Sequence, residues 1–299
     1  MTPTLPDAAV RAALAEHWGL DRAVVTPHHG GMNSATWFVD DGDRRRVAKS
    51  VPAAAAGDFA GGLLVAAHLQ RAGIRAGAPV PALDGRSVVT VDGLPLALLA
   101  RVPGRPLEPD DQPMIGATLA SVHQRLLGFD PPWAHRFHWV DPAAAHLGIR
   151  PWVRPAVTAA VEALDTGSMT WGLLHTDPAP EAFRLDGRTC GLIDWSWAMS
   201  GPLLYDLASA VMYVGGPDRA TALIDAYLRS GVLSAGEVRQ GLAAMLRFRF
   251  AVQTDYFARR ITGNDLTGID GPADNERGLA HARLLLRVPA GGEGVNSAP

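Results

Sequence analysis

The sequence predicts an α+β protein with a small β-rich N-terminal lobe and a larger helical C-terminal lobe. Short strand-like runs separated by glycine turns fill much of the first hundred residues. Farther along, apolar residues recur at the three- and four-residue spacing of helices. The segment 101–106, which holds two prolines and a glycine, separates the two patterns. We therefore predict lobes at 1–101 and 102–287, followed by a disordered tail at 288–299.

The composition is that of a globular protein with a full hydrophobic core. Of 299 residues, 47% are hydrophobic and 19% are charged, and the net charge is −3, so neither nucleic acid nor a membrane is expected as a partner. No apolar run reaches the roughly 18 residues of a membrane span. The single cysteine, Cys190, cannot form an internal disulfide. We expect a cytoplasmic monomer or homodimer whose partner is a small molecule.

The N-terminal lobe is predicted to contain two helices and four strands. Asp7 is placed to cap the first helix, and glycines end both helices. A turn at Asp41-Gly42-Asp43 joins the first two strands into a hairpin. The helices are expected over 8–18 and 59–72, and the strands over 36–39, 46–51, 87–91 and 95–99.

The C-terminal lobe is predicted to be helical apart from one hairpin. The apolar residues of each helical segment fall on one stripe. The hairpin joins strands 183–185 and 190–193 around Asp186-Gly187. The helices are expected over 115–127, 155–164, 203–213, 220–228 and 237–260.

This hairpin places two carboxylates together. Asp177 stands shortly before the first strand and Asp194 directly after the second, and the two ends of an antiparallel hairpin lie side by side. Like charges at close range raise one another's pKa unless a cation separates them, and a divalent metal is the usual remedy. One carboxylate then binds Mg²⁺ on a nucleotide while the other orients or deprotonates an attacking hydroxyl, as in phosphoryl transfer.

A phosphoryl donor also needs a positive point charge and backbone donors around its phosphates. Lys49 is the only lysine among the 27 basic residues, and it lies on a predicted strand. Gly30-Gly31, just before the hairpin, offers backbone N–H groups. Taken alone, Lys49 would read as an edge-strand residue that prevents sheet aggregation, and the glycine pair as an ordinary turn. Together with the two aspartates, they predict a nucleotide site.

These motifs, in this order, resemble the aminoglycoside phosphotransferase and choline kinase-like family, which are small-molecule relatives of the protein kinases. The resemblance spans residues 8–285. It rests on an N-lobe strand lysine (Val47-Ala48-Lys49), a His175-x-Asp177 catalytic loop, a Gly191-Leu192-Ile193-Asp194-Trp195 metal turn and a Gly201-to-Ala208 helix start.

The resemblance implies a bilobal protein-kinase-like fold with ATP and Mg²⁺ in the cleft. Asp177 would be the catalytic base or the residue that orients the hydroxyl, with His175 holding the catalytic loop. Asp194 would ligate the metal, and Lys49 would contact the α- and β-phosphates. Residues Gly30, Gly31, Asn33 and Ser34 would cover the phosphates, and Leu99 and Arg101, within 98–102, would pair with the base.

The catalytic loop departs from the family pattern at two positions. Ala182 stands where the family has an asparagine that binds a second metal, and an alanine cannot ligate. The adjacent Glu181 could substitute, because Mg²⁺ accepts a carboxylate. Thr176 replaces the usual glycine between the catalytic histidine and aspartate.

The lysine also lacks its expected partner. The N-lobe helix of the family presents a glutamate to the lysine, but that place falls here near Gly61-Gly62. Lys49 could pair with Asp58, with Asp194, or with nothing in the absence of nucleotide.

The acceptor pocket is the least determined part of the site. In the family the C-terminal helices line it, and Arg249, Gln253, Tyr256 and Arg260 fall on one side of the 237–260 helix. The alternative is that these four residues form a solvated helix face. Asp206 is expected either to cap its helix or to brace the catalytic loop.

Other candidate residues are interpreted as structural. His135 and His138 lack a third ligand, so they are expected to be surface or packing residues. The tryptophans at 133, 139, 152, 171 and 197 are expected in the core.

We predict an ATP-dependent O-phosphotransferase that acts on a small-molecule hydroxyl, with an antibiotic or a metabolite as acceptor. The losses in the catalytic loop leave an alternative, a nucleotide-binding pseudokinase or sensor without transferase activity. A purely structural domain is the third possibility. The acceptor and the choice between ATP and GTP stay open.

Overall fold

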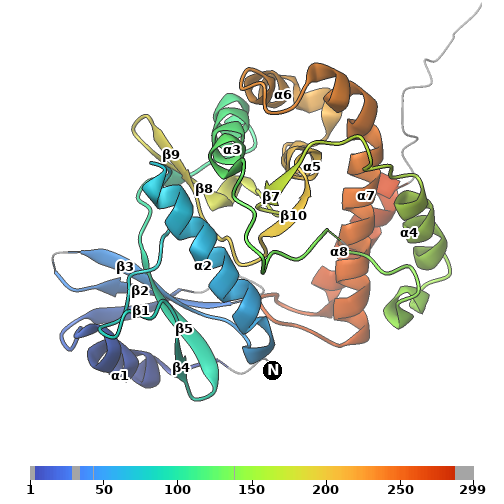
Figure 1. Ribbon diagram of the computed structural model, residues 1–299. Helices are drawn as coiled ribbons and strands as arrows, with labels where there is room; N and C mark the ends of the chain where they lie inside the picture. The colour runs from blue at the N-terminus through green and yellow to red at the C-terminus, as the bar shows by residue number, and fades with distance from the viewer. Residues whose placement is uncertain (1–3, 29–33, 43, 138, 287–299) are drawn as a thin grey trace, which may run out of the picture.

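Two lobes of unequal size make up the computed structural model, which describes residues 4–28, 34–42, 44–137 and 139–286 (Figure 1). The smaller lobe is an antiparallel sheet with two helices, and the larger lobe is mainly helical. The predicted α+β fold is confirmed. The predicted tail at 288–299 lies outside the described residues.

The small lobe is built on five antiparallel strands in the order β1-β2-β3-β5-β4. One face packs on α1 through a core that includes Val10, Leu14 and Trp37. On the other face, α2 packs through Phe59 and Leu63. The elements are α1 (Asp7–Trp18), β1 (Val24–His28), β2 (Ala35–Asp40), β3 (Arg45–Ser50), η1 (Ala53–Ala55), α2 (Ala56–Arg71), β4 (Val89–Val91) and β5 (Leu94–Ala100).

The first helix starts differently from the prediction. The capping position is Pro6, and Asp7 is already helical. The Asp7 carboxylate instead accepts a hydrogen bond of 2.8 Å from the Trp37 indole on β2. The prediction that Asp7 caps the helix was therefore wrong, because the carboxylate ties the helix to the sheet.

The segment between the lobes is clamped onto the catalytic hairpin. β6 (Arg105–Pro106) pairs with β8 (Phe183–Asp186), which in turn pairs with β9 (Thr189–Leu192). Gly104 has a φ of 111°, and a Cβ there would lie 2.3 Å from the Leu185 carbonyl oxygen, so only glycine fits. Arg105 then makes a bidentate pair with Asp111 at the start of α3.

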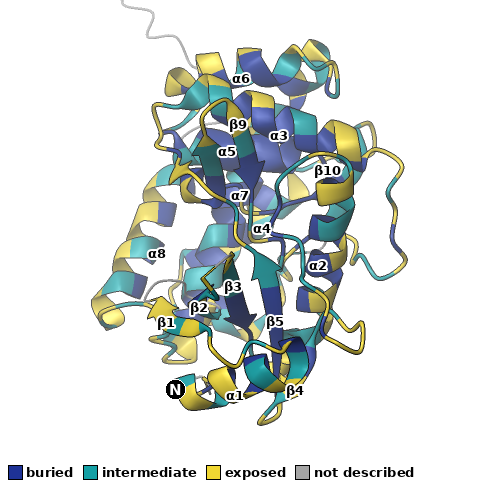
Figure 2. Cartoon of the chain, turned by 90° about the vertical axis from the view of Figure 1, so that its left-hand side faces the viewer, coloured by how far each residue is buried: buried dark blue, intermediate teal, exposed yellow. Residues whose placement is uncertain are grey.

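The large lobe surrounds one nearly completely buried helix, α5, which lies behind the β8–β9 hairpin in the view of Figure 2. The second helix, α2, also packs into this core through Val65 and Leu69, so it bridges the lobes. The elements are α3 (Gln112–Leu126), η2 (Ala145–Gly148), α4 (Val153–Glu162), β7 (Trp171–Leu174), η3 (Pro180–Ala182), β10 (Met199–Pro202), α5 (Leu204–Tyr213), η4 (Pro217–Arg219), α6 (Thr221–Leu228), α7 (Ala235–Thr262) and α8 (Pro272–Leu286).

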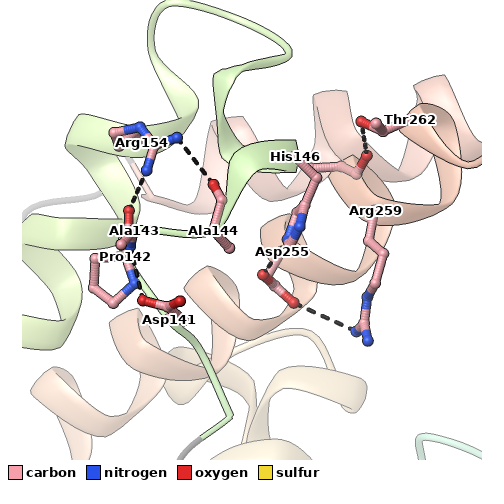
Figure 3. A network of polar contacts seen from close by, with 10 residues as sticks. Asp141, Pro142, Ala143, Ala144, His146, Arg154, Asp255, Arg259 and Thr262 are labelled. Carbon is pink, nitrogen blue, oxygen red and sulfur yellow. Dashed lines mark hydrogen bonds and ion pairs between the residues drawn. The ribbon is translucent and has the colours of Figure 1, made fainter.

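A polar network fixes the irregular segment before α4 to the long helix α7 (Figure 3). His146 and Asp255 form a contact of 2.6 Å between Nε2 and Oδ1, and Arg259 pairs with the other carboxylate oxygen. Arg154 donates to the carbonyls of Pro142 and Ala144. The wall of the large lobe beside α7 is therefore anchored. Within the described ranges, no helix is long and apolar enough to span a bilayer.

Candidate active site

The cleft between the lobes has a volume of about 660 Å³ and collects most of the predicted nucleotide-site residues. Its lining takes in both lobes and the hairpin that follows the catalytic loop. The predicted residues that line it are Ser34, Lys49, Leu99, Arg101, His175, Asp177, Glu181 and Asp194. Three further predicted residues, Gly30, Gly31 and Asn33, lie outside the described residues.

Lys49 and Asp194 form an ion pair across the cleft. The Nζ–Oδ1 distance is 2.5 Å, and Lys49 is only 9% exposed. Enclosure in the cleft raises the pKa of the Asp194 carboxyl, but the charge and hydrogen bond of Lys49 outweigh this effect and hold the pKa below its ordinary value. Asp58 instead lies 3.2 Å from His135. Of the three alternatives for Lys49, the structure selects Asp194.

Close packing of α2 explains why this helix offers the lysine no glutamate. A Cβ at Gly62 would lie 2.1 Å from the carbonyl oxygen of Trp195, in the turn that follows Asp194. No side chain fits at that place. The helix therefore contacts the turn through its backbone, and Asp194 itself becomes the partner of Lys49.

The β8–β9 hairpin brings the two aspartates to one wall of the cleft, as predicted. Its strands end where the Ile193 N–H donates to the Ala182 carbonyl at 2.9 Å. The His175 Nε2 donates to the Ile193 carbonyl at 2.8 Å, and its Nδ1 accepts from the Asp177 N–H at 3.3 Å. These contacts assign a ring proton to Nε2. His175 thus links the two ends, in agreement with its predicted role of holding the loop.

Asp206 braces the catalytic loop from beneath. Fully buried, its carboxylate accepts hydrogen bonds from the N–H groups of His175 (2.7 Å) and Thr176 (2.8 Å). The imidazole of His123 on α3 is 3.1 Å away and completes the cluster. Thr176 has a φ of 79°, a region that β-branched residues rarely adopt. The brace therefore holds a strained backbone directly before Asp177.

Two side chains hold Asp177 from the large lobe. The Tyr213 hydroxyl donates to its Oδ1 at 2.5 Å, and the Arg249 Nη2 lies 3.1 Å from the same atom. Arg249 is buried and also donates to the Ser209 hydroxyl at 3.0 Å. Burial raises the pKa of Tyr213, and so does the Asp177 charge, so the phenol keeps its proton. The sequence analysis missed Tyr213, because only the packing of α5 against α7 brings it to Asp177.

Of the four predicted acceptor residues, two are buried and two are half-buried. Arg249 and Arg260 are both buried, so the alternative of a solvated helix face was wrong. The Arg260 guanidinium donates to the Thr267 carbonyl, between α7 and α8, and to the Asn275 side chain on α8. It therefore has a structural role. The Tyr256 hydroxyl lies 3.3 Å from the same guanidinium. The Gln253 Oε1 is buried with no hydrogen-bond partner among the described residues. None of the four lines the 660 Å³ cleft.

The donor set suits a hard divalent cation. Asp177, Asp194 and Glu181 offer carboxylate oxygens to one cleft, which is the ligand chemistry that Mg²⁺ prefers, alongside substrate phosphates. Glu181 is exposed, whereas Ala182 is buried and contributes only backbone hydrogen bonds. Among the described residues, no three His, Cys, Asp or Glu side chains come close enough together to hold a metal ion by themselves, and this includes the three carboxylates of the cleft.

The remaining structural interpretations hold with one exception. His135 faces Asp58, and His138 lies outside the described residues. The other predicted tryptophans pack against the core, but Trp197 is 41% exposed and lines the cleft. The prediction that Trp197 is a core residue was wrong, because its turn follows Asp194 into the cleft.

The fold and this site define a family. Residues 24–244 match the model of the phosphotransferase enzyme family (APH), and the chain belongs to that family.

Its relatives by sequence include homoserine kinases. The enzyme of Rhodopseudomonas palustris is 26% identical over 57% of this chain and 59% of its own, so the chain spans about three-fifths of that relative's length. The enzyme of Methylobacillus flagellatus is 27% identical over 84% of this chain and 85% of its own.

Solved structures share the fold. A microcompartment-associated aminopropanol kinase superposes with a TM-score of 0.73 at 19% identity, covering 93% of this chain and 95% of its own. An amicoumacin kinase bound to AMP-PNP, Ca²⁺ and amicoumacin gives 0.70 at 15% identity, covering 93% and 92%. The bilobal kinase-like fold is thereby confirmed.

Proposed function

We propose that this protein is an ATP-dependent O-phosphotransferase, which moves the γ-phosphate of ATP to the hydroxyl of a small molecule. The observation that carries the proposal is the arrangement on one cleft wall: Asp194, paired with buried Lys49 at 2.5 Å, beside Asp177, held by Tyr213 and Arg249. A metal-binding carboxylate, a phosphate-binding ammonium and a positioned base are the three parts that phosphoryl transfer needs.

The nucleotide is placed by residues at both ends of the cleft. Lys49 contacts the α- and β-phosphates, and the family resemblance implies that Gly30, Gly31, Asn33 and Ser34 would cover them. Leu99 and Arg101 pair with the base through backbone groups. Asp194 and Glu181 would hold Mg²⁺, which would neutralise phosphate charge when bound.

Asp177 acts on the acceptor. Its carboxylate accepts the proton of the acceptor hydroxyl as the new O–P bond forms and the bond between the γ-phosphorus and the bridging oxygen breaks. Among the described residues, the side-chain contacts of Tyr213 and Arg249 are both to Oδ1, so Oδ2 can face the hydroxyl. The transfer is direct and in line, with no phosphoenzyme.

The acceptor is a small hydroxyl compound, an antibiotic or a metabolite. This class agrees with relatives named for homoserine, aminopropanol and amicoumacin. We place the protein in the cytoplasm as a monomer or homodimer, with no nucleic acid or membrane as partner.

The second candidate function is a nucleotide-binding sensor without transfer activity. Ala182 favours it, because this position offers no metal ligand and Glu181 must replace one. A sensor of this kind would bind ATP but would release no ADP with any acceptor.

An acceptor screen by ADP release tests the proposal. Amino alcohols, hydroxy amino acids, sugars, aminoglycosides and other hydroxylated antibiotics are offered with Mg·ATP. Asp177→Ala serves as the blank. Asp186→Ala is the matched control, because it removes an exposed carboxylate at the end of β8 that pairs only with Arg75 among the described residues. We expect acceptor-dependent ADP release in the wild type and the control but not in the blank. Equal release by the blank would refute the mechanism.

A further inference from the structure

The turn that carries Asp194 is held by two neighbouring side chains of the catalytic loop. His175 donates from Nε2 to the Ile193 carbonyl at 2.8 Å, directly before Asp194. The Thr176 hydroxyl donates to the Trp197 carbonyl at 3.0 Å, three residues after Asp194. The two hydrogen bonds therefore bracket the turn, and Asp194 lies between the two points of attachment.

Both sides of this connection adopt a backbone conformation that side chains disfavour. Thr176 has a φ of 79° and Asp194 a φ of 73°, which places both in the left-handed region. Such strain persists only where the surrounding contacts enforce it. A glycine at position 176 would adopt this φ freely, but it could not donate a side-chain hydrogen bond. The hydroxyl is therefore what the strained threonine contributes and a glycine would not.

The position of the Asp194 carboxylate depends on the backbone of its turn. The Asp194 side chain is 55% exposed and lines the cleft, so packing does not fix it. Next to it, Trp195 is buried and donates to the Leu192 carbonyl at 2.9 Å, which anchors the first half of the turn. Thr176 is fully buried and holds the second half at Trp197. A buried hydrogen bond of this kind is costly to lose, because its acceptor is left without a partner.

We propose that Thr176 is a positioning residue for metal binding, whose hydroxyl holds the Trp197 carbonyl and so keeps Asp194 presented to a divalent cation on the nucleotide. Thr176 is not among the described residues that line the cleft, so it acts through Asp194. A carboxylate that is already in place binds a cation without the entropic cost of ordering the turn. The proposal rests on the proposed function, because it requires Asp194 to bind the metal.

Calorimetry with and without the cation separates this role from a general loosening of the fold. The probes are Mg·ATP and ATP in the presence of EDTA. Thr176→Val keeps the β-branched shape and removes the hydroxyl, whereas Thr176→Ser keeps the hydroxyl. Thr176→Gly removes both the hydroxyl and the strain, and it decides the question if the valine variant does not fold. Thr189→Val, the same change at an exposed position on β9, is the matched control.

We expect Thr176→Val and Thr176→Gly to raise the Kd of Mg·ATP about fivefold, which is the effect of one lost buried hydrogen bond. The Kd of metal-free ATP should change less than twofold, because Lys49 does not depend on this turn for its place on β3. Thr176→Ser and Thr189→Val should stay within twofold of the wild type for both probes.

Three results would each overturn the proposal: a Mg·ATP Kd within twofold of the wild type in the folded variants that lack the hydroxyl, an equal rise for metal-free ATP, or no recovery in Thr176→Ser. If the wild type binds neither probe, the proposed function itself fails. If it binds both probes equally, Asp194 does not act through a metal, and the proposal fails with that role. Unfolding midpoints verify that each variant is folded.

Discussion

The two sides of Asp177 are built in different ways. On the nucleotide side, Lys49, His175 and Asp194 come from strands and from the two ends of one hairpin, and backbone pairing fixes their positions. On the acceptor side, Tyr213 and Arg249 come from helices α5 and α7, whose contact depends on side-chain packing. A site positioned by local backbone pairing can be predicted from the sequence, whereas a site positioned by helix packing cannot. The predictions below test how independent the two sides are.

The largest expected effect lies beneath both sides, at Asp206. Asp206→Ala leaves the buried N–H groups of His175 and Thr176 without partners, and we expect it to lower the free energy of unfolding by about 3–5 kcal/mol. Urea unfolding measures the loss. Asp218→Ala removes an exposed carboxylate and is the control. A loss within about 1 kcal/mol of the control would show that the loop does not depend on this brace.

On the nucleotide side, Asp194→Ala should weaken Mg·ATP binding. The change removes a metal ligand and leaves Lys49 buried without its partner, and we expect the Kd to rise about 30- to 100-fold. Calorimetry measures the Kd, with Asp186→Ala as control. A Kd within threefold of the wild type would mean that Asp194 does not contribute to nucleotide binding.

On the acceptor side, Arg249→Met should lower turnover with little change in nucleotide binding. The guanidinium positions Asp177, so its removal is expected to reduce kcat about 10- to 50-fold while the Kd of Mg·ATP stays within twofold. Kinetics with an acceptor from the screen, together with calorimetry, give both values. If the Kd of Mg·ATP rises as much as kcat falls, the nucleotide side and the acceptor side of Asp177 do not act independently, which contradicts the comparison.

The smallest expected effect concerns the clamp between the lobes. The hydrogen bonds from Arg105 hold the pKa of Asp111 at about 2, below its ordinary value near 3.8. Because the folded pKa is the lower one, the stabilisation is complete above about pH 4 and is lost as the pH falls toward 2. Asp111→Asn should lower Tm by about 1–2 °C at pH 7, a difference that shrinks below pH 4. A difference that persists unchanged at pH 3 would contradict this assignment.

Much of the nucleotide side could be predicted from the sequence. Strand-like runs, turn residues and a two-aspartate hairpin predicted one site for Lys49, Asp177 and Asp194, and all three line the cleft. The lobe boundary at 101–106 stays a prediction. These features are encoded over short stretches, where backbone pairing leaves few alternatives.

The remainder depends on contacts between distant elements. Gly62 is required by the close approach of a carbonyl more than 130 positions away in the chain, and Tyr213 meets Asp177 only once α5 is buried. Contacts like those of Gly62 and Tyr213 leave no periodicity in the sequence. Helix α8 was not predicted although Leu279, Ala282 and Leu286 are buried at helical spacing, because the fourth buried position is the polar Asn275.

The most direct test of the central claim is the separation of turnover from binding in Asp177→Ala. Mg·ATP affinity and acceptor-dependent ADP release are measured on the same protein preparation. The account predicts that kcat falls at least about 1,000-fold while the Kd of Mg·ATP stays within threefold, because Asp177 acts on the acceptor and Asp194 on the nucleotide. Turnover within tenfold of the wild type would contradict the account.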